Sequence, residues 1–172
     1  MDDLPEEKLL GAAEATYGEK YRDHLLEQYK LYLGMADKIS DRRQSANTFF
    51  LTVNSALVAL FTVPGLGTTT WHVTVSLAGA VISYTWYRLI RSYSDINSGK
   101  FKVVHRIETY LPIRLFDAEW VILGEGKNPK KYLPFSRIEM RLPWVFMVIY
   151  LFMLISRCWW IVGWIFKYIK GS

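Results

Sequence analysis

Apolar residues gather in three segments, at residues 49–63, 71–87 and 142–166. The first two lie in a block, residues 44–87, that contains no Lys, Arg, Asp or Glu. A helix needs about 20 residues to cross a bilayer, so this block is long enough for two crossings. Pro64 and two glycines separate its halves and break helices. The pattern predicts a tight transmembrane hairpin and, farther along the chain, a third membrane helix.

A heptad-like row of residues runs along the sequence that leads into the first span. Its members alternate steps of four and three, which places them on one face of a helix. No Pro or Gly interrupts residues 35–63, so this helix is expected to continue into the first span as one rod. We interpret the row as a seam between subunits; the alternative is an amphipathic helix packed on its own chain. The row is Leu25, Tyr29, Tyr32, Ala36, Ile39, Arg43 and Ala46.

A second polar region, residues 98–135, is expected to hold short helices and loops. Apolar residues from Phe101 to Leu111 fall on one helical face, which Pro112 would end. Phe116, Trp120 and Leu123 suggest a second short helix, closed by the glycines that follow. Ser136 and Glu139 have the spacing of a capping box, which predicts that the third membrane helix begins at about 137. Pro143 is expected to kink it.

Together these elements predict an all-α membrane protein that forms homo-oligomers. A long N-terminal helix runs into the hairpin, and a cytoplasmic helical layer precedes the third transmembrane helix. We divide the chain into a cytoplasmic N-terminal helical region (1–45), a transmembrane hairpin (46–90), a cytoplasmic helical and basic loop region (91–136), and a third membrane helix with its tail (137–172).

The distribution of charge predicts the orientation in the membrane. The chain carries a formal net charge of +5. The hairpin turn has no Lys or Arg, whereas both outer flanks of the hairpin are basic. The positive-inside rule therefore places the N-terminus and the region between hairpin and third helix in the cytoplasm. Lys167 and Lys170 in the tail fit this rule less well, which keeps a two-span protein with an interfacial third helix as the alternative. The first twenty residues lack the features of a signal peptide.

Polar residues recur every seven positions in the first span. Asn47 and Asn54 form one row, and Thr48, Ser55 and Thr62 form another. Hydroxyl groups can satisfy themselves on a preceding carbonyl, but an amide in hydrocarbon needs partners on another helix or water. We interpret both rows as one polar stripe that lines a pore or a subunit junction. In the second span, a row of small residues predicts a close-packing surface for a neighbouring helix. This row is Ser76, Gly79, Ala80 and Ser83.

Arg157 is the only charged residue inside an apolar segment. A charge at the centre of the bilayer costs about 3 kcal/mol or more. Three tryptophans follow closely and resemble an aromatic belt, so Arg157 can reach the outer interface. The alternative is one Arg157 from each subunit in a ring that lines the pore and favours anions.

Basic residues outside the spans form the candidate ligand site. They could meet anionic lipid headgroups. Neighbouring aromatic residues also suit a nucleotide or a single-stranded oligonucleotide, whose bases stack on aromatic rings. The candidate ligand-binding residues are Arg42, Arg43, Lys127, Lys130, Lys131 and Tyr132.

No motif for an enzyme is present in the sequence. It lacks the phosphate-binding loop, the nucleophile elbow and the zinc-protease helix. The single cysteine, Cys158, excludes an internal disulfide and a cysteine-cluster metal site. We therefore expect no catalytic activity, no metal and no cofactor.

Residues 29–54 resemble the RipA family of octameric bacterial membrane proteins. Shorter matching stretches lie at 86–88 with 92–93, at 97–101, at 117–120 and at 132–135. The resemblance spans roughly residues 21 to 155. It implies a homo-oligomeric, multi-pass protein of the bacterial inner membrane, between a tetramer and an octamer, in contact with lipids.

The chain is also similar in plan to HalA-type membrane effectors of the Hailong anti-phage system. Those effectors are oligomeric ion channels held shut by DNA oligomers from a partner nucleotidyltransferase. No HalA motif matches residue by residue, so no ligand residue carries over. The similarity implies a channel-like effector gated by a nucleotide or a single-stranded DNA oligomer. The alternative is a non-conducting membrane scaffold that recruits cytoplasmic partners or lipids, and an enzyme with a site between subunits is the least favoured hypothesis.

Overall fold

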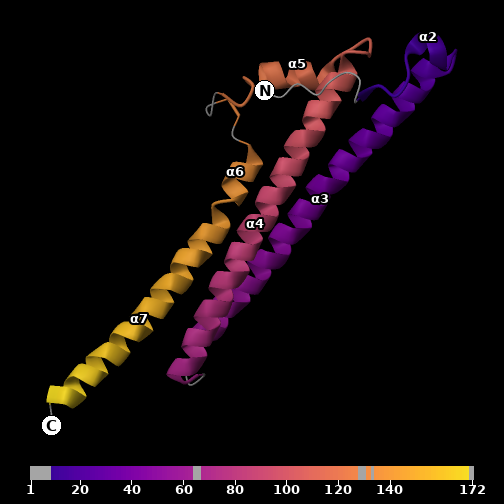
Figure 1. Ribbon diagram of the computed structural model, residues 1–172. Helices are drawn as coiled ribbons and strands as arrows, with labels where there is room; N and C mark the ends of the chain where they lie inside the picture. The colour runs from indigo at the N-terminus through magenta and orange to yellow at the C-terminus, as the bar shows by residue number, and fades with distance from the viewer. Residues whose placement is uncertain (1–8, 64–66, 128–130, 133, 171–172) are drawn as a thin grey trace. The chain divides into compact units, whose positions relative to one another are not determined.

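The computed structural model describes residues 9–63, 67–127, 131–132 and 134–170, and every regular element in these ranges is a helix. Short helices are α2 (Glu14–Tyr17), α5 (Leu115–Ile122) and α6 (Phe135–Glu139). Long helices are α3 (Tyr21–Thr62), α4 (Thr69–Glu108) and α7 (Leu142–Lys170) (Figure 1). The protein is therefore all-α, as the sequence predicts.

The chain divides into two compact units, and each long helix of the hairpin contributes to both. The charged unit comprises Met1–Arg42 and Ser94–Leu133, and the apolar unit comprises Arg43–Tyr93 and Pro134–Ser172. α3 is one uninterrupted helix of 42 residues, so the predicted rod is confirmed. α4 is longer than expected, because the helical face that includes Phe101 and Val104 continues the second apolar segment without a break and ends at Glu108.

Two stretches are long and apolar enough to cross a membrane. They are α3 and residues Arg137–Arg157. α4 does not meet the same criterion among the described residues. Its apolar half contains His72, Ser76, Ser83 and several other polar or aromatic residues, which lower its hydropathy.

The seam of α3 packs on its own chain. In the charged unit Tyr29 and Ala36 are buried, and the ring of Tyr32 lies beneath the Lys100 ammonium of α4, with 4.4 Å from Nζ to the ring centre. Our interpretation of this row as a subunit contact is therefore wrong for Tyr29 and Ala36. The reason is that α4 extends beyond its apolar half and packs along the charged part of α3. The sequence pattern did not predict this extension.

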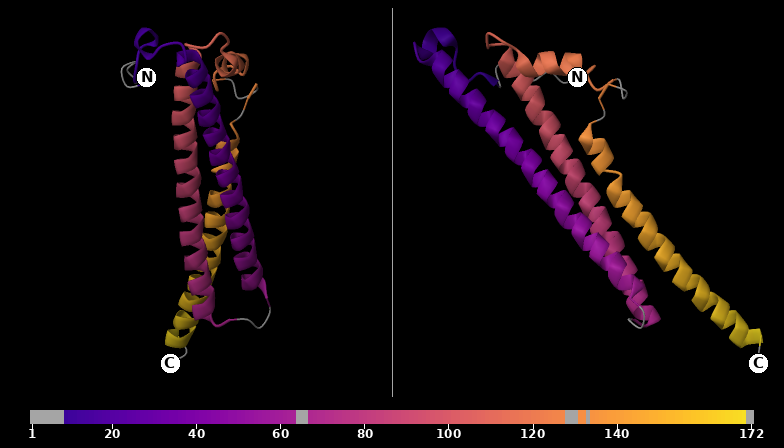
Figure 2. Two further views of the ribbon diagram at one scale, coloured as in Figure 1. Left: turned by 90° about the vertical axis from the view of Figure 1, so that its right-hand side faces the viewer. Right: turned by 180° about the vertical axis from the view of Figure 1, so that it is seen from behind.

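The small-residue row of α4 forms a close contact, as predicted, and the neighbouring helix is α7. A Cβ atom added at Gly79 would lie 2.3 Å from the ring of Tyr150, so only glycine leaves room for this ring. Tyr150 is fully buried, and Ser76 and Ser83 beside Gly79 are buried too. In the apolar unit the first half of α7 accordingly lies alongside α4 (Figures 1 and 2).

The last apolar stretch begins at Arg137, as predicted, but it is not one continuous helix. α6 ends at Glu139, a turn follows, and α7 begins at Leu142. Pro143 therefore stands in the first turn of α7, directly after the break between α6 and α7, where its missing N–H has no helical partner to lose. The Glu139 carboxylate lies 3.2 Å from Nε of Arg43, and the capping box stays a prediction. The side chain of Ser136 lies outside the described residues.

Candidate conduction path and ligand site

Asn54 lies in the interior of the apolar unit. Its side chain is fully buried, and its amide Nδ2 donates a hydrogen bond to the carbonyl of Phe50 at 2.8 Å. The Oδ1 atom accepts a hydrogen bond from the hydroxyl of Ser83 on α4 at 3.0 Å. The hydroxyl of Tyr150 on α7 donates to the backbone carbonyl of Asn54 at 3.1 Å. One residue therefore joins three helices of the same subunit.

Asn47 makes an equivalent connection seven residues earlier. Its Oδ1 atom accepts a hydrogen bond from the indole Nε1 of Trp86 at 2.9 Å. Trp86 is fully buried, and its ring stacks on Phe50 with 6.0 Å between ring centres and 7° between ring planes. The prediction that the amides face a pore or a subunit junction is wrong for Asn54, and Asn47 also bonds within the subunit.

The hydroxyl row is separate from the amide row. Thr48, Ser55 and Thr62 are exposed, and so is Thr52, which extends the same face. Neighbouring positions on an α-helix differ by about 100°, so rows that are one residue apart cannot form one stripe when one of them is buried. Three of these hydroxyls donate to carbonyls of their own helix: Thr48 to Gln44, Thr52 to Thr48, and Thr62 to Ala59. We call Thr48, Thr52, Ser55 and Thr62 the hydroxyl stripe.

Arg157 contacts an aromatic residue of its own subunit. The centre of its guanidinium group lies 5.7 Å from the ring centre of Phe61, within the range of a cation–π interaction. Phe61 in turn meets His72 edge to face at 4.7 Å. The guanidinium thus contacts the end of α3. Its participation in a ring of subunits stays a prediction.

The candidate ligand residues differ in their exposure and in whether they already have a carboxylate partner. Arg43 is occupied by Glu139, with side chains only 18% and 23% exposed, and Lys127 pairs with Glu125 at the surface. Arg42 and Lys131 are exposed, and Tyr132 is half-buried. Lys130 lies outside the described residues. Two of the predicted cations therefore already have carboxylate partners that an anionic ligand would have to displace.

A buried carboxylate that our sequence reasoning missed organises the charged unit. Glu108, the last residue of α4, is fully buried. Its Oε1 accepts hydrogen bonds from the hydroxyl of Tyr29 at 2.9 Å and from the backbone N–H of Phe116 at 3.0 Å. Its Oε2 accepts one from the backbone N–H of Asp117 at 3.0 Å. Glu108 thus caps the N-terminus of α5, where free N–H groups favour an anion.

These contacts change two pKa values. Burial alone would raise the pKa of Glu108, but the hydrogen bonds from Phe116, Asp117 and Tyr29 and the charge of His105 lower it below its ordinary value. Burial and the neighbouring carboxylate raise the pKa of Tyr29 to about 12. Near neutral pH the pair is therefore a neutral phenol that donates to an ionised carboxylate.

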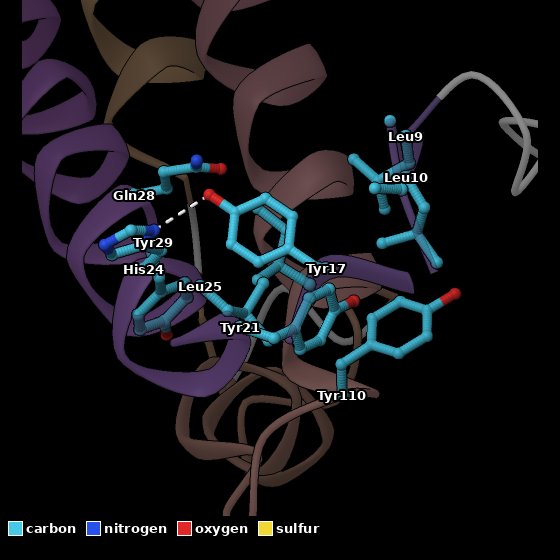
Figure 3. A pocket seen from close by; sticks show the side chains of 12 residues that line it. Leu9, Leu10, Tyr17, Tyr21, His24, Leu25, Gln28, Tyr29 and Tyr110 are labelled. Carbon is cyan, nitrogen blue, oxygen red and sulfur yellow. Dashed lines mark hydrogen bonds between the residues drawn. The ribbon is translucent and has the colours of Figure 1, made fainter. Parts of the chain in front are cut away.

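A pocket of about 370 Å³ in the charged unit lies beside this pair (Figure 3). Four tyrosines line it, and the hydroxyl of Tyr17 lies 2.8 Å from Nδ1 of His24. No lysine or arginine is among the described residues that line it, and phosphate binding needs positive charge. The tyrosines are Tyr17, Tyr21, Tyr29 and Tyr110.

The described residues contain no group of three potential metal ligands. No curated protein and no solved structure matches the chain. A family model described as the octameric membrane protein family matches residues 26–159, which is most of the sequence. The chain therefore belongs to the octameric membrane protein family.

Proposed function

We propose that the protein is the subunit of an oligomeric, channel-like membrane assembly whose conduction path follows the hydroxyl stripe of α3. The observation that carries this proposal is that the amide and hydroxyl side chains of α3 lie in different places in the apolar unit. The two amides make hydrogen bonds to α4 of the same subunit, whereas four hydroxyls are exposed on a part of the helix that carries no charge. Hydroxyl groups on that face give ions or water partners where neighbouring subunits meet.

The exposed face of α7 between residues 144 and 155 has no such row of hydroxyls, whereas α3 carries its row beside exposed apolar residues such as Phe49 and Leu60. The exposed side chains of this α7 face are apolar or aromatic, which suits contact with lipid tails. The difference between the two helices supports an arrangement with α3 toward the other subunits and α7 toward lipid. The exposed residues of α7 are Trp144, Val145, Val148, Leu151, Phe152 and Ile155.

The proposal includes a multi-pass topology in a bacterial inner membrane. α3 and α7 each cross once, and α4 returns between them, since residues 44–87 are free of charge. The basic flanks support a cytoplasmic N-terminus. The assignment to the inner membrane rests on the resemblance to the RipA family. The proposal gives the chain no catalytic role.

Gating by an anionic ligand is the second part of the proposal. The positive surplus of residues 88–141 and the exposed Arg42 and Lys131 support a nucleotide or single-stranded DNA oligomer as the ligand. A partner nucleotidyltransferase as its source, and a role in anti-phage defence, rest on the similarity in plan to HalA-type effectors. Because Arg43 and Lys127 have carboxylate partners, this ligand would bind mainly to the other cations.

Ion flux into liposomes tests the conduction proposal. The reconstituted wild-type oligomer is expected to conduct, and Ser55→Leu should reduce the flux several-fold because it removes a hydroxyl and adds bulk to the stripe. Ser156→Leu is the matched control: Ser156 is also exposed and bonds to a carbonyl of its own helix, but it lies on α7. Equal flux for both variants would contradict a path along α3.

A non-conducting scaffold is the second candidate, and the buried amides favour it. Asn54 holds three helices of one subunit together, so the amide row has a purely structural role that needs no pore. A wild-type oligomer that is fully assembled in liposomes and passes no ions, with and without single-stranded DNA oligomers, would decide for the scaffold.

A further inference from the structure

Large apolar side chains are exposed on and beside α5, in the charged unit. Ile113 is 67% exposed, Leu115 66% and Ile122 73%. Leu115 and Ile122 are seven residues apart, with Ala118 between them, so they share one face of this short helix. We call Ile113, Leu115, Ala118, Val121 and Ile122 the α5 patch. Such a cluster on a soluble surface usually marks an interaction site.

A shallow groove of about 460 Å³ lies on α3 of the same unit. Leu31 and Met35 are 68% and 54% exposed there. A Cβ atom added at Gly34 would meet nothing within 4 Å, so the glycine leaves open space in the groove. We call this feature the α3 groove; its lining residues are Glu27, Lys30, Leu31, Gly34, Met35 and Lys38.

Lipid tails do not suit either surface. The α3 groove includes three charged side chains, and α5 carries Asp117 and Glu119 beside its patch. The charges are complementary, because Glu119 borders the α5 patch and two lysines border the α3 groove. Positions 31, 34 and 38 have three-and-four spacing, so within the charged unit they share one face of α3, away from the buried Tyr29 and Ala36.

The family description supplies the occupant, because an octameric family implies that further copies of this chain are its neighbours. A closed ring of identical subunits needs two different surfaces on each subunit, one for each neighbour. Within the charged unit, α5 lies on the other side of α4 from α3, as Figure 1 and the right panel of Figure 2 show. The α5 patch and the α3 groove therefore belong to helices that α4 separates, so one subunit can offer them to two different neighbours, as a head-to-tail ring requires.

We propose that the α5 patch of one subunit docks in the α3 groove of the next subunit and that this contact repeats around the oligomer. Ile122 and Leu115 fill the space above Gly34, and Glu119 lies near Lys30 and Lys38. This contact concerns the charged unit and does not depend on ion conduction.

A side chain placed in the α3 groove tests the proposal, because it should block docking without unfolding the subunit. Gly34→Leu adds a side chain into open space and replaces a glycine inside a helix with a strong helix former. The purified variant should keep its helical content by circular dichroism but shift from the octamer to smaller species in mass photometry. Gly99→Leu is the matched control, since Gly99 is an exposed helical glycine of the same unit with nothing within 4 Å. An intact octamer for Gly34→Leu would overturn the proposal.

Cross-linking tests the head-to-tail geometry independently. In a Cys158→Ala background, the double variant Leu31→Cys, Ile122→Cys should form a ladder of covalent species up to the octamer under mild oxidation. Each single variant should stay uncross-linked, because in a ring Leu31 meets Ile122 of the neighbour and not its own counterpart. Covalent dimers from Leu31→Cys alone, or an octamer of the double variant without cross-links, would overturn the proposal.

Discussion

Replacing Glu108 with alanine should lower the free energy of unfolding of the charged unit by about 3 kcal/mol, because a buried hydrogen-bonded carboxylate is lost and its donors stay behind. The backbone N–H groups of Phe116 and Asp117 and the hydroxyl of Tyr29 would all lose their acceptor. α5 should detach first, which protease sensitivity near Leu115 and thermal unfolding in detergent can both measure. Asp95→Ala, at an exposed aspartate of α4 in the same unit, is the control and should change stability by at most about 0.5 kcal/mol.

The same carboxylate predicts an acid-sensitive fold. Because the pKa of Glu108 is lower in the folded protein than its ordinary value of 4.5, its contribution is present above about pH 4.5 and is lost as pH falls through the folded value. The wild-type protein should therefore lose stability between pH 5 and the folded pKa, and Glu108→Ala should lose less over the same range. An identical acid dependence of the two proteins would contradict the role of this residue.

Replacing Asn54 with leucine should destabilise the apolar unit by about 1–2 kcal/mol, since hydrogen bonds between membrane helices contribute on that scale. Leucine has a similar shape, so the change removes mainly the bond to Ser83 and leaves the Ser83 hydroxyl buried without this acceptor. Thermal unfolding of the detergent-solubilised protein, followed by size-exclusion chromatography, measures the loss.

Two controls separate the amide from other polar groups of the same unit. Ser76→Ala should be neutral or slightly stabilising, because the buried Ser76 Oγ has no hydrogen-bond partner in the part of the chain that the structure describes. Thr52→Val removes an exposed hydroxyl that bonds only to its own helix and should change little. If Asn54→Leu is as harmless as these two changes, Asn54 does not hold the helices together.

Sequence periodicity predicted the helices well because each apolar face is a local property. The uninterrupted α3 and the packing surface around Gly79 both follow from spacing along one helix. The direction of the polar rows could not be predicted in the same way. Asn54 and Ser55 differ by one position, and only the placement of α4 and α7 decides which of them is buried.

Glu108 could not be identified because its partners are distant in sequence. Tyr29 lies 79 residues away, and the cap of α5 depends on the turn between Glu108 and Leu115. The sequence contained one indirect signal: a glutamate at the end of a basic helical segment, close to Pro112, is a poor match for a helix C-terminus and needs another partner. The resemblance to octameric membrane proteins, by contrast, rested on long motifs, and the family match confirms it.

The most direct test of a path along α3 is the reactivity of cysteines placed on its hydroxyl stripe. In a Cys158→Ala background, Ser55→Cys and Ser156→Cys would be reconstituted as oligomers in liposomes and treated with a membrane-impermeant thiol reagent. Our account predicts that Ser55→Cys reacts and that its flux falls on modification, while Ser156→Cys is protected by lipid. Reaction of Ser156→Cys with no reaction of Ser55→Cys would contradict it.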